Sequence, residues 1–454
     1  MNKTLVINAV GLTPDLIGEH TPTLAAFRDA GRLTDVGGML PAVTTSVQTT
    51  YVTGVSPSEH GVVGNGWYFK DEREVKFWRQ CNDLVQSPRL WDIAKAEDPG
   101  FTCANSFWWY NMYSSVDYSI TPRPMYPADG RKIPDVYTYP SGLRDELQED
   151  LGQFPLFKFW GPATTRESTD WIARATIRLD QKHNPTLSLV YLPHLDYVLQ
   201  REGPGGPSVG KDLRELDDAV ALLLNHFQDA RVVILSEYGI SSVSRPVHLN
   251  RVLREAGCLA IRSELGLELM DAGASDAFAV ADHQIAHVYV QKPERLDEVR
   301  KLMESTDGVA RVLTGGGRSE AGLDHERSGD LIVIAEPDAW FTYYYWLDDR
   351  LAPDYARTVD IHRKPGYDPV ELFLDPSIPM IKLKLAGTLL KKKLGFRTLM
   401  NVIPLDASLV KGSHGLCPDS PGVGPMLMSN VPELVPESGV AATSVRDVLL
   451  SHLR

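Results

Sequence analysis

Short apolar runs that alternate with stretches of helical spacing restrict the fold of this chain more than any other feature. Residues 5–7, 188–192 and 231–236 have the composition of buried strands. Helical spacing is found over residues 22–30 and 213–227. Buried strands that alternate with helices predict an α/β fold, in which helices cover both faces of a sheet.

The later part of the chain predicts a second, smaller unit. Its pattern is strand, helix, strand and strand, over residues 286–291, 293–305, 308–313 and 330–335. We expect an α+β cap at residues 263–399, inserted into an α/β core of residues 1–262 and 400–454. The chain is then predicted to return to the main sheet around residues 401–414. A length of 454 residues agrees with more than one unit.

The composition limits the partners of the chain. The hydrophobic fraction of 43% and charged fraction of 23% are typical of a soluble globular protein. A net charge of −13 argues against nucleic-acid binding through a generally basic surface. It does not argue against a small phosphate ester, because a bound metal can outweigh the global charge. We therefore expect a small-molecule partner and no nucleic acid, and the sequence leaves the oligomeric state open.

The cysteines and the apolar runs predict a cytoplasmic protein. Cys81, Cys103, Cys258 and Cys417 are far apart and form no C-x-x-C pair, which favours reduced thiols. The first apolar run is too short for a signal peptide. No stretch approaches the ~20 apolar residues of a membrane-spanning helix.

Residues 381–396 form a basic amphipathic stretch, with five lysines among leucines. Such a helix can lie on an anionic membrane surface. It can also be an ordinary surface helix whose lysines extend along apolar surface into water. The second arrangement is the more common, so the sequence alone favours it.

A hydroxyl residue lies at the head of another predicted helix. Thr44 follows Pro41 in the segment Leu40-Pro41-Ala42-Val43-Thr44-Thr45-Ser46. The N-terminus of a helix offers unpaired N–H groups and a positive dipole end, which suit an anionic phosphoryl oxygen. The alternative is an ordinary helix start with no ligand.

Polar residues follow the predicted strands where each strand ends. They are Asn8 after the first run, Asp196 and Gln200 after the second, Glu237 and Tyr238 after the third, and His414 late in the chain. Ligands of open α/β sheets gather at the carboxyl ends of the strands. We therefore expect these side chains to meet in one site.

The order of these segments resembles that of the alkaline phosphatase superfamily. The most similar branch is the type I phosphodiesterases and nucleotide pyrophosphatases, and the chain is also similar to phosphonoacetate hydrolases. The resemblance implies an alkaline-phosphatase-like sheet between helices, with Thr44 as the nucleophile. It also implies sites for two divalent metals, at the positions of Asn8, Thr44, Asp196, Gln200, Glu237, Tyr238 and His414.

Several of these positions depart from the family pattern. Asn8 stands for an aspartate, Gln200 for a histidine, and Glu237-Tyr238 for an Asp-His pair. The change makes the site richer in oxygen ligands, which suit magnesium or manganese better than zinc. Each replacement keeps an atom that can ligate a metal. We therefore expect a retuned site with one or two divalent ions, Zn, Mn or Mg.

Four further residues are candidates for substrate binding. Asn65 lies in the segment that matches the family after the nucleophile helix, and His194, His362 and Lys364 lie near charged or ligand-like residues. Cationic side chains bind phosphate oxygens in many sites. A hydrogen-bonded loop histidine is the alternative for His194 and His362. We expect the tempting pairs at residues 282–283 and 324–326 to be solvated loop residues of the cap.

Together these features predict metal-dependent hydrolysis of a phosphodiester or pyrophosphate bond in a small soluble substrate, through Thr44. One alternative is a phosphatase, phosphonate hydrolase or transferase on the same scaffold. Another is a catalytically inactive homologue that keeps only the anion pocket, since a fold does not determine a function.

Overall fold

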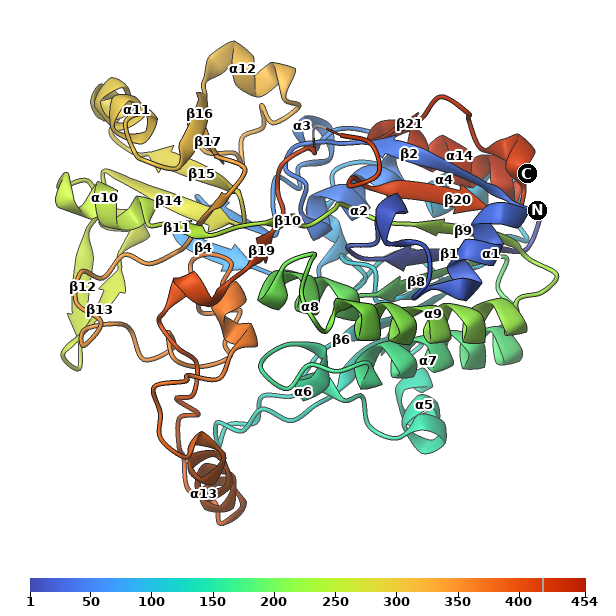
Figure 1. The fold of residues 1–454 in the computed structure, drawn as a ribbon, viewed down its shortest axis with the longest axis horizontal. Helices are drawn as coiled ribbons and strands as arrows, with labels where there is room; N and C mark the ends of the chain where they lie inside the picture. The colour runs from blue at the N-terminus through green and yellow to red at the C-terminus, as the bar shows by residue number, and fades with distance from the viewer. Residues whose placement is uncertain (419) are drawn as a thin grey trace.

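The centre of the molecule is a nine-stranded mixed sheet (Figure 1). The computed structural model describes residues 1–418 and 420–454. In sheet order the strands are β21 (Val440–Ala441), β2 (Arg32–Gly37), β20 (Met426–Ser429), β9 (Arg231–Leu235), β1 (Thr4–Ala9), β8 (Leu187–Leu192), β5 (Cys103–Ser106), β6 (Tyr118–Pro122) and β7 (Val136–Tyr139). β9, β1, β8, β5 and β6 are parallel, whereas β20 and β7 run antiparallel to their neighbours. The three predicted apolar runs are therefore three adjacent strands, β9, β1 and β8.

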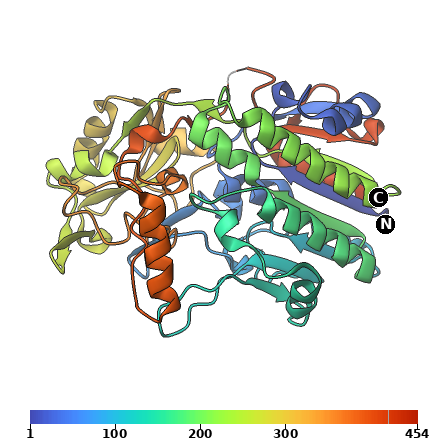
Figure 2. The ribbon, with the colours of Figure 1, turned by 60° about the horizontal axis from the view of Figure 1, so that its bottom comes forward.

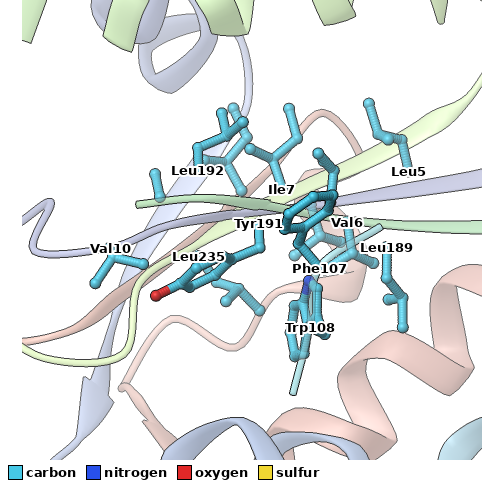
Figure 3. Packing of buried hydrophobic residues seen from close by; sticks show 14 of the residues in the cluster. Leu5, Val6, Ile7, Val10, Phe107, Trp108, Leu189, Tyr191, Leu192 and Leu235 are labelled. Carbon is cyan, nitrogen blue, oxygen red and sulfur yellow. The ribbon is translucent and has the colours of Figure 1, made fainter. Parts of the chain in front are cut away.

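These central strands are buried on both faces, which explains their continuous apolar composition. Leu5 and Ile7 of β1 lie in the same core as Leu189 and Leu192 of β8 (Figure 3). Besides Thr4 at its start, β1 has a second buried polar residue in Asn8, which pairs in register with Tyr191. The sheet thus holds a buried amide at the carboxyl end of its central strand.

Helices cover both faces of this sheet (Figures 1 and 2). One group consists of α1 (Pro22–Ala30), α5 (Leu143–Leu151), α6 (Leu156–Phe159), α7 (Glu167–His183), α8 (His194–Glu202) and α9 (Val209–His226). The other consists of α2 (Thr44–Thr53), α3 (Pro57–His60), α4 (Leu90–Glu97) and α14 (Val445–Leu453). The predicted α/β fold, with its sheet between helices, is confirmed.

A second, antiparallel sheet lies beside the first. Its order is β14 (Ala277–Asp282), β15 (Ile285–Val290), β17 (Leu331–Ala335) and β16 (Val309–Leu313), and the accompanying helices are α10 (Leu249–Glu255), α11 (Leu296–Glu304) and α12 (Gly315–Glu320). Short pairs are β3 (Gly66–Phe69) with β4 (Glu74–Phe77), β10 (Ser241–Ser242) with β19 (Gly412–Ser413), β11 (Arg245–Val247) with β18 (Ala339–Phe341), and β12 (Ile261–Glu264) with β13 (Leu267–Met270). The second core also includes Leu249 and Ile403, so the cap limits 263–399 stay a prediction.

The chain returns to the main sheet later than predicted. Around residues 401–414 the short strand β19 pairs with β10 and not with the main sheet. Ile403 and Val410 are buried in the second core, which holds this segment beside the cap. The strand that pairs with β9 is β20.

The basic stretch forms helix α13 (Ile381–Lys393), at the edge of the molecule (Figure 1). Over residues 1–418 and 420–454, no helix has both the length and the hydropathy needed to cross a membrane. The cytoplasmic location stays a prediction.

Candidate active site

The predicted polar residues meet at the carboxyl ends of β9, β1 and β8. Asn8 is the penultimate residue of β1, and Asp196 lies in the first turn of α8 after β8. Glu237 and Tyr238 follow β9 with one residue, Ser236, between. His414 reaches the same place from the segment after β19. Adjacent parallel strands end at one edge of a sheet, so the topology brings residues from distant parts of the sequence together.

Thr44 is the first residue of α2, and it is 4% exposed. Its hydroxyl is hydrogen-bonded to the phenol of Tyr238, with 3.0 Å between Thr44 Oγ1 and the Tyr238 oxygen. The phenol in turn donates to Asp196 Oδ1 at 3.4 Å. A line of exchangeable protons thus connects Thr44 to a buried carboxyl group.

Glu237 is held by two side-chain amides. Asn8 Nδ2 and Gln48 Nε2 both donate to Glu237 Oε1, at 2.5 and 2.6 Å. Glu237 Oε2 and Asn8 Oδ1 are buried, and neither has a hydrogen-bond partner within the described part of the chain. Two oxygens with free lone pairs therefore lie on the Thr44 side of the site.

Asp196 is held by a different amide. Gln200 Nε2 donates to Asp196 Oδ2 at 2.5 Å, and Gln200 Oε1 accepts from the Tyr367 hydroxyl at 2.9 Å. Both ends of the Gln200 amide are thus engaged, unlike the amide of Asn8.

Four aromatic rings form a column beside Asp196, which we call the ring column. Tyr238 stacks on His414 with 3.6 Å between ring centroids. His283 lies 3.6 Å from His414 and 3.7 Å from Tyr367, again between centroids. His414 Nδ1 donates to the Ala42 carbonyl at 2.7 Å, which leaves the lone pair of Nε2 free.

Burial controls the protonation of the site. It raises the pKa of Asp196 to about 7, against the opposing effect of the hydrogen bonds from Gln200 and Tyr238. It raises the pKa of Glu237 to about 8, while the amides of Gln48 and Asn8 act in the opposite direction. Burial lowers the pKa of His414 to about 3, so its imidazole is neutral. Without a bound cation, Glu237 is therefore mostly protonated near neutral pH, and Asp196 is protonated in about half of the molecules.

The Thr44 side of the site fits one hard cation by the chemistry of its donors. Asn8 Oδ1 and Glu237 Oε2 are buried and without partners, and the Thr44 hydroxyl lies in the same site. Amide, carboxylate and hydroxyl oxygens are ligands that magnesium and manganese accept.

The Asp196 side does not fit a second metal ion. Asp196 Oδ1 lies 4.0 Å from His414 Nε2, but Gln200 is engaged by two hydrogen bonds and Tyr238 covers the imidazole face. Among the residues that the structure describes, no three His, Cys, Asp or Glu side chains converge to hold a metal. The number of ions, one or two, stays a prediction.

Asn65 lies beside the start of α2, and its contact with a substrate stays a prediction. Its Oδ1 accepts from the Thr45 backbone N–H at 3.0 Å. Its own N–H groups donate to both oxygens of Asp282, at 2.7 and 3.1 Å. Asp282 and His283 are thus buried, and the expectation that they are solvated loop residues is wrong. They end β14, and the second sheet carries them into the site.

The other three candidates for substrate binding lie elsewhere. His194 is bonded to Thr169 Oγ1 and the Asp212 carbonyl, both at 3.1 Å, between α7 and α9. His362 is exposed, and Lys364 is buried with its ammonium 2.7 Å from both Asp368 and Glu371. Substrate contact by His194, His362 and Lys364 stays a prediction that this placement does not favour.

Sequence reasoning missed two residues that shape the site. Gln48 holds Glu237 and accepts from the Trp109 N–H at 2.7 Å. It lies four residues after Thr44, one helical turn along α2, and that spacing is a usable signal. Tyr367 forms the end of the ring column, although it lies about 170 residues after Gln200 in the sequence. No local sequence pattern indicates that it belongs to the site.

The profile of the type I phosphodiesterase / nucleotide pyrophosphatase family matches residues 4–368. The chain belongs to this family. A relative from Schizosaccharomyces pombe, described as an uncharacterized pyrophosphatase/phosphodiesterase, is 25% identical over 260 residues. That match covers 54% of this chain and 46% of the relative, so it spans less than half of the relative's length.

Two solved structures show the same fold as this family member. Murine ectonucleotide pyrophosphatase/phosphodiesterase 5, in an inactive form bound to AMP, is 12% identical with a TM-score of 0.60, over 100% of this chain and 95% of that chain. Phosphonoacetate hydrolase from Sinorhizobium meliloti 1021, in complex with phosphonoformate, is 12% identical with a TM-score of 0.63, over 100% and 96%. The predicted resemblance to the alkaline phosphatase superfamily is confirmed.

Proposed function

We propose that this chain hydrolyses a phosphodiester or pyrophosphate bond in a small substrate, with Thr44 as the nucleophile. The observation that carries the proposal is the buried hydroxyl of Thr44 at the N-terminus of α2, hydrogen-bonded to Tyr238. Family membership and the phosphate or phosphonate ligands named for the two similar structures support the substrate class.

The side chains of the site supply a route for the proton of Thr44. As Thr44 Oγ1 forms its bond to phosphorus, its proton passes to the Tyr238 oxygen, and the phenol proton passes to Asp196 Oδ1. The bond from phosphorus to the leaving group breaks in the same step, and the leaving oxygen keeps the electron pair and takes a proton from the solvent. A water oxygen then forms a bond to phosphorus as the bond to Thr44 Oγ1 breaks. Thr44 Oγ1 regains its proton from Asp196 through Tyr238, and the proton that the water loses passes to the solvent.

The proposal includes one divalent ion bound on the Thr44 side of the site. Asn8, Glu237 and Thr44 would hold it through oxygen atoms, and magnesium or manganese suits this donor set better than zinc. When bound, such an ion neutralises the charge of the phosphoryl oxygens and lowers the pKa of the hydroxyl. The amides of Asn8 and Gln48 orient Glu237 for this role.

The alternative is a homologue that binds the anion without turnover. The ring column and the engaged amide of Gln200 favour it, because they occupy positions that carry metal ligands in the family resemblance. This alternative predicts that a phosphate ester binds equally well when the Thr44 hydroxyl is removed.

The test measures metal content after purification without chelator, together with hydrolysis of a chromogenic phosphodiester in zinc, manganese or magnesium. We expect about one ion per chain, and turnover that is higher in manganese or magnesium. Thr44→Ala is expected to lower kcat/KM by at least about 10³-fold, whereas Thr44→Ser keeps the hydroxyl and most of the rate. Absence of turnover with all three ions would overturn the proposal in favour of the binding homologue. An active Thr44→Ala variant would overturn the assignment of Thr44 as the nucleophile.

A further inference from the structure

Helix α13 presents an apolar stripe to solvent. Leu383, Leu390 and Leu394 are spaced by seven and four residues, so they share one side of the helix. Their side chains are 66%, 58% and 66% exposed. Met380 before the helix and Phe396 after it are 72% and 65% exposed. Exposed apolar groups that gather in this way mark interaction surfaces.

The other side of the helix already has a partner. Ile381 and Leu385, four residues apart, are partly buried and pack against the second core. By helical geometry they lie opposite the stripe of Leu383, Leu390 and Leu394. The stripe is therefore not the face that attaches α13 to the protein.

Basic residues flank the stripe on both sides. Lys384 and Lys391 lie along one flank, and Lys382 and Lys393 along the other. Residues 376–405 include these four, Lys392 and Arg397, and contain no Asp or Glu, although the whole chain carries a net charge of −13. In the described residues no carboxylate forms an ion pair with any of these six cations. Arg397 lies near Asp129 and lowers the pKa of that carboxyl group, whereas the five lysines have no ion-pair partner among the described residues.

The segment is also anchored in a defined position. Lys384 Nζ donates to the Asn401 carbonyl, and Arg397 donates to the carbonyls of Ala128 and Asp129 between β6 and β7. Figure 2 shows α13 in front of the body of the molecule, with its length free of other helices. The leucines of the stripe are exposed, and so are Lys382, Lys391 and Lys393 beside it.

We propose that α13 docks the protein on an anionic lipid bilayer. Leu383, Leu390 and Leu394 enter the boundary between head groups and acyl chains, and the lysines on both flanks contact the phosphate and carboxylate groups of the lipids. A bilayer satisfies the apolar stripe and both basic flanks at once. The proposal departs from the ordinary surface helix that the sequence favours, because the leucines, and not only the lysine stems, are exposed. The inference is independent of the proposed hydrolysis.

The test is flotation of the full chain with phosphatidylcholine vesicles that contain or lack phosphatidylserine, at low and physiological ionic strength. Partitioning onto the anionic vesicles is expected to be at least about tenfold higher, and to fall as salt is added. Lys391→Glu, Lys392→Glu and Lys393→Glu combined should remove the preference for anionic lipid. Leu383→Ser, Leu390→Ser and Leu394→Ser combined should reduce binding at both ionic strengths.

A matched variant controls for net charge. This variant makes the same change of charge at three exposed positions outside α13, with Arg174→Glu, Lys301→Glu and Arg311→Glu combined. It should bind vesicles as the natural chain does. Circular dichroism checks that all variants keep the fold. The proposal is overturned if the natural chain binds neither vesicle, if it binds both equally, or if the control loses as much binding as the lysine variant. Self-association that needs the three leucines and occurs in place of lipid binding would assign the stripe to a second copy of the chain.

Discussion

The two sides of the active site differ in what their amides do. On the Thr44 side, Asn8 and Gln48 hold one oxygen of Glu237 and leave its other oxygen free. On the Asp196 side, both ends of the Gln200 amide are engaged and Tyr238 covers His414. One side thus keeps free oxygen ligands, whereas the other is closed by hydrogen bonds and stacked rings.

The comparison indicates that residues at equivalent positions of a site can take on different chemical roles. Where the family resemblance implies a histidine, Tyr238 places a hydroxyl between Thr44 and Asp196. We infer that the Thr44 side binds the cation, and that the Asp196 side handles the proton. Substitutions on one side at a time separate these two roles.

The largest effect is expected at Glu237. Glu237→Gln removes the carboxylate whose free oxygen lies on the Thr44 side, so kcat/KM should fall by about 10³-fold and manganese affinity should fall with it. Asp196→Asn should leave manganese affinity unchanged, because Asp196 belongs to the other side. Calorimetric titration with manganese and steady-state kinetics measure both quantities. Glu268→Gln, at a partly buried carboxylate paired with Arg254 in the second unit, is the control. Equal loss of manganese affinity in the Glu237 and Asp196 variants would contradict the division of roles.

A variant of Lys364 tests whether its ion pairs stabilise the segment that carries Tyr367, on the Asp196 side of the site. The Lys364 ammonium neutralises Asp368 and Glu371 in the segment that carries Tyr367. Lys364→Met leaves two buried carboxylates without a cation and should lower the free energy of unfolding by about 3 kcal/mol. Urea denaturation measures this loss, and Lys70→Met, at an exposed lysine, should change stability little. A substrate-binding role would instead raise KM and leave stability unchanged.

The sequence predicted the fold well because its signals are local. The apolar runs of β1, β8 and β9 identify the buried strands, and the polar residue after each one marks the edge of the sheet. The partners of those residues are set by tertiary contacts. Tyr367 and His283 reach the site from the second unit, and the Lys364 ion pairs depend on burial that no sequence pattern reveals.

The return strand shows the same limit. Residues 401–414 have the apolar content of a strand, and they lie beside the second unit because Ile403 and Val410 find a core there. Which of two cores receives an apolar segment is decided by packing over the whole chain. The local pattern carries no information on that choice.

Tyr238 tests the proton route directly. Tyr238→Phe keeps the ring against His414 and removes the hydroxyl, so kcat/KM should fall by about 10²-fold. Manganese affinity should not change, in contrast to Glu237→Gln. Tyr345→Phe makes the same chemical change at a hydroxyl bonded to Tyr355 in the second core, and should retain activity. A Tyr238→Phe variant as active as the natural chain would remove the phenol from the route.

The smallest effect concerns the support behind Thr44. Burial raises the pKa of Asp282 from 3.8 to about 7, so the folded state prefers the protonated acid. The contribution of protonated Asp282 to the free energy of unfolding is complete below pH 3.8, the ordinary pKa of the group, and is lost as the pH rises through about 7. Between about pH 5 and pH 8, Asp282 alone should cost about 2 kcal/mol of stability. Asp282→Asn should flatten the pH dependence of unfolding by that amount, whereas Asp307→Asn, at an exposed carboxylate, should not. If Asp282→Asn unfolds with the pH dependence of the natural chain, Asp282 is ionised in the folded protein.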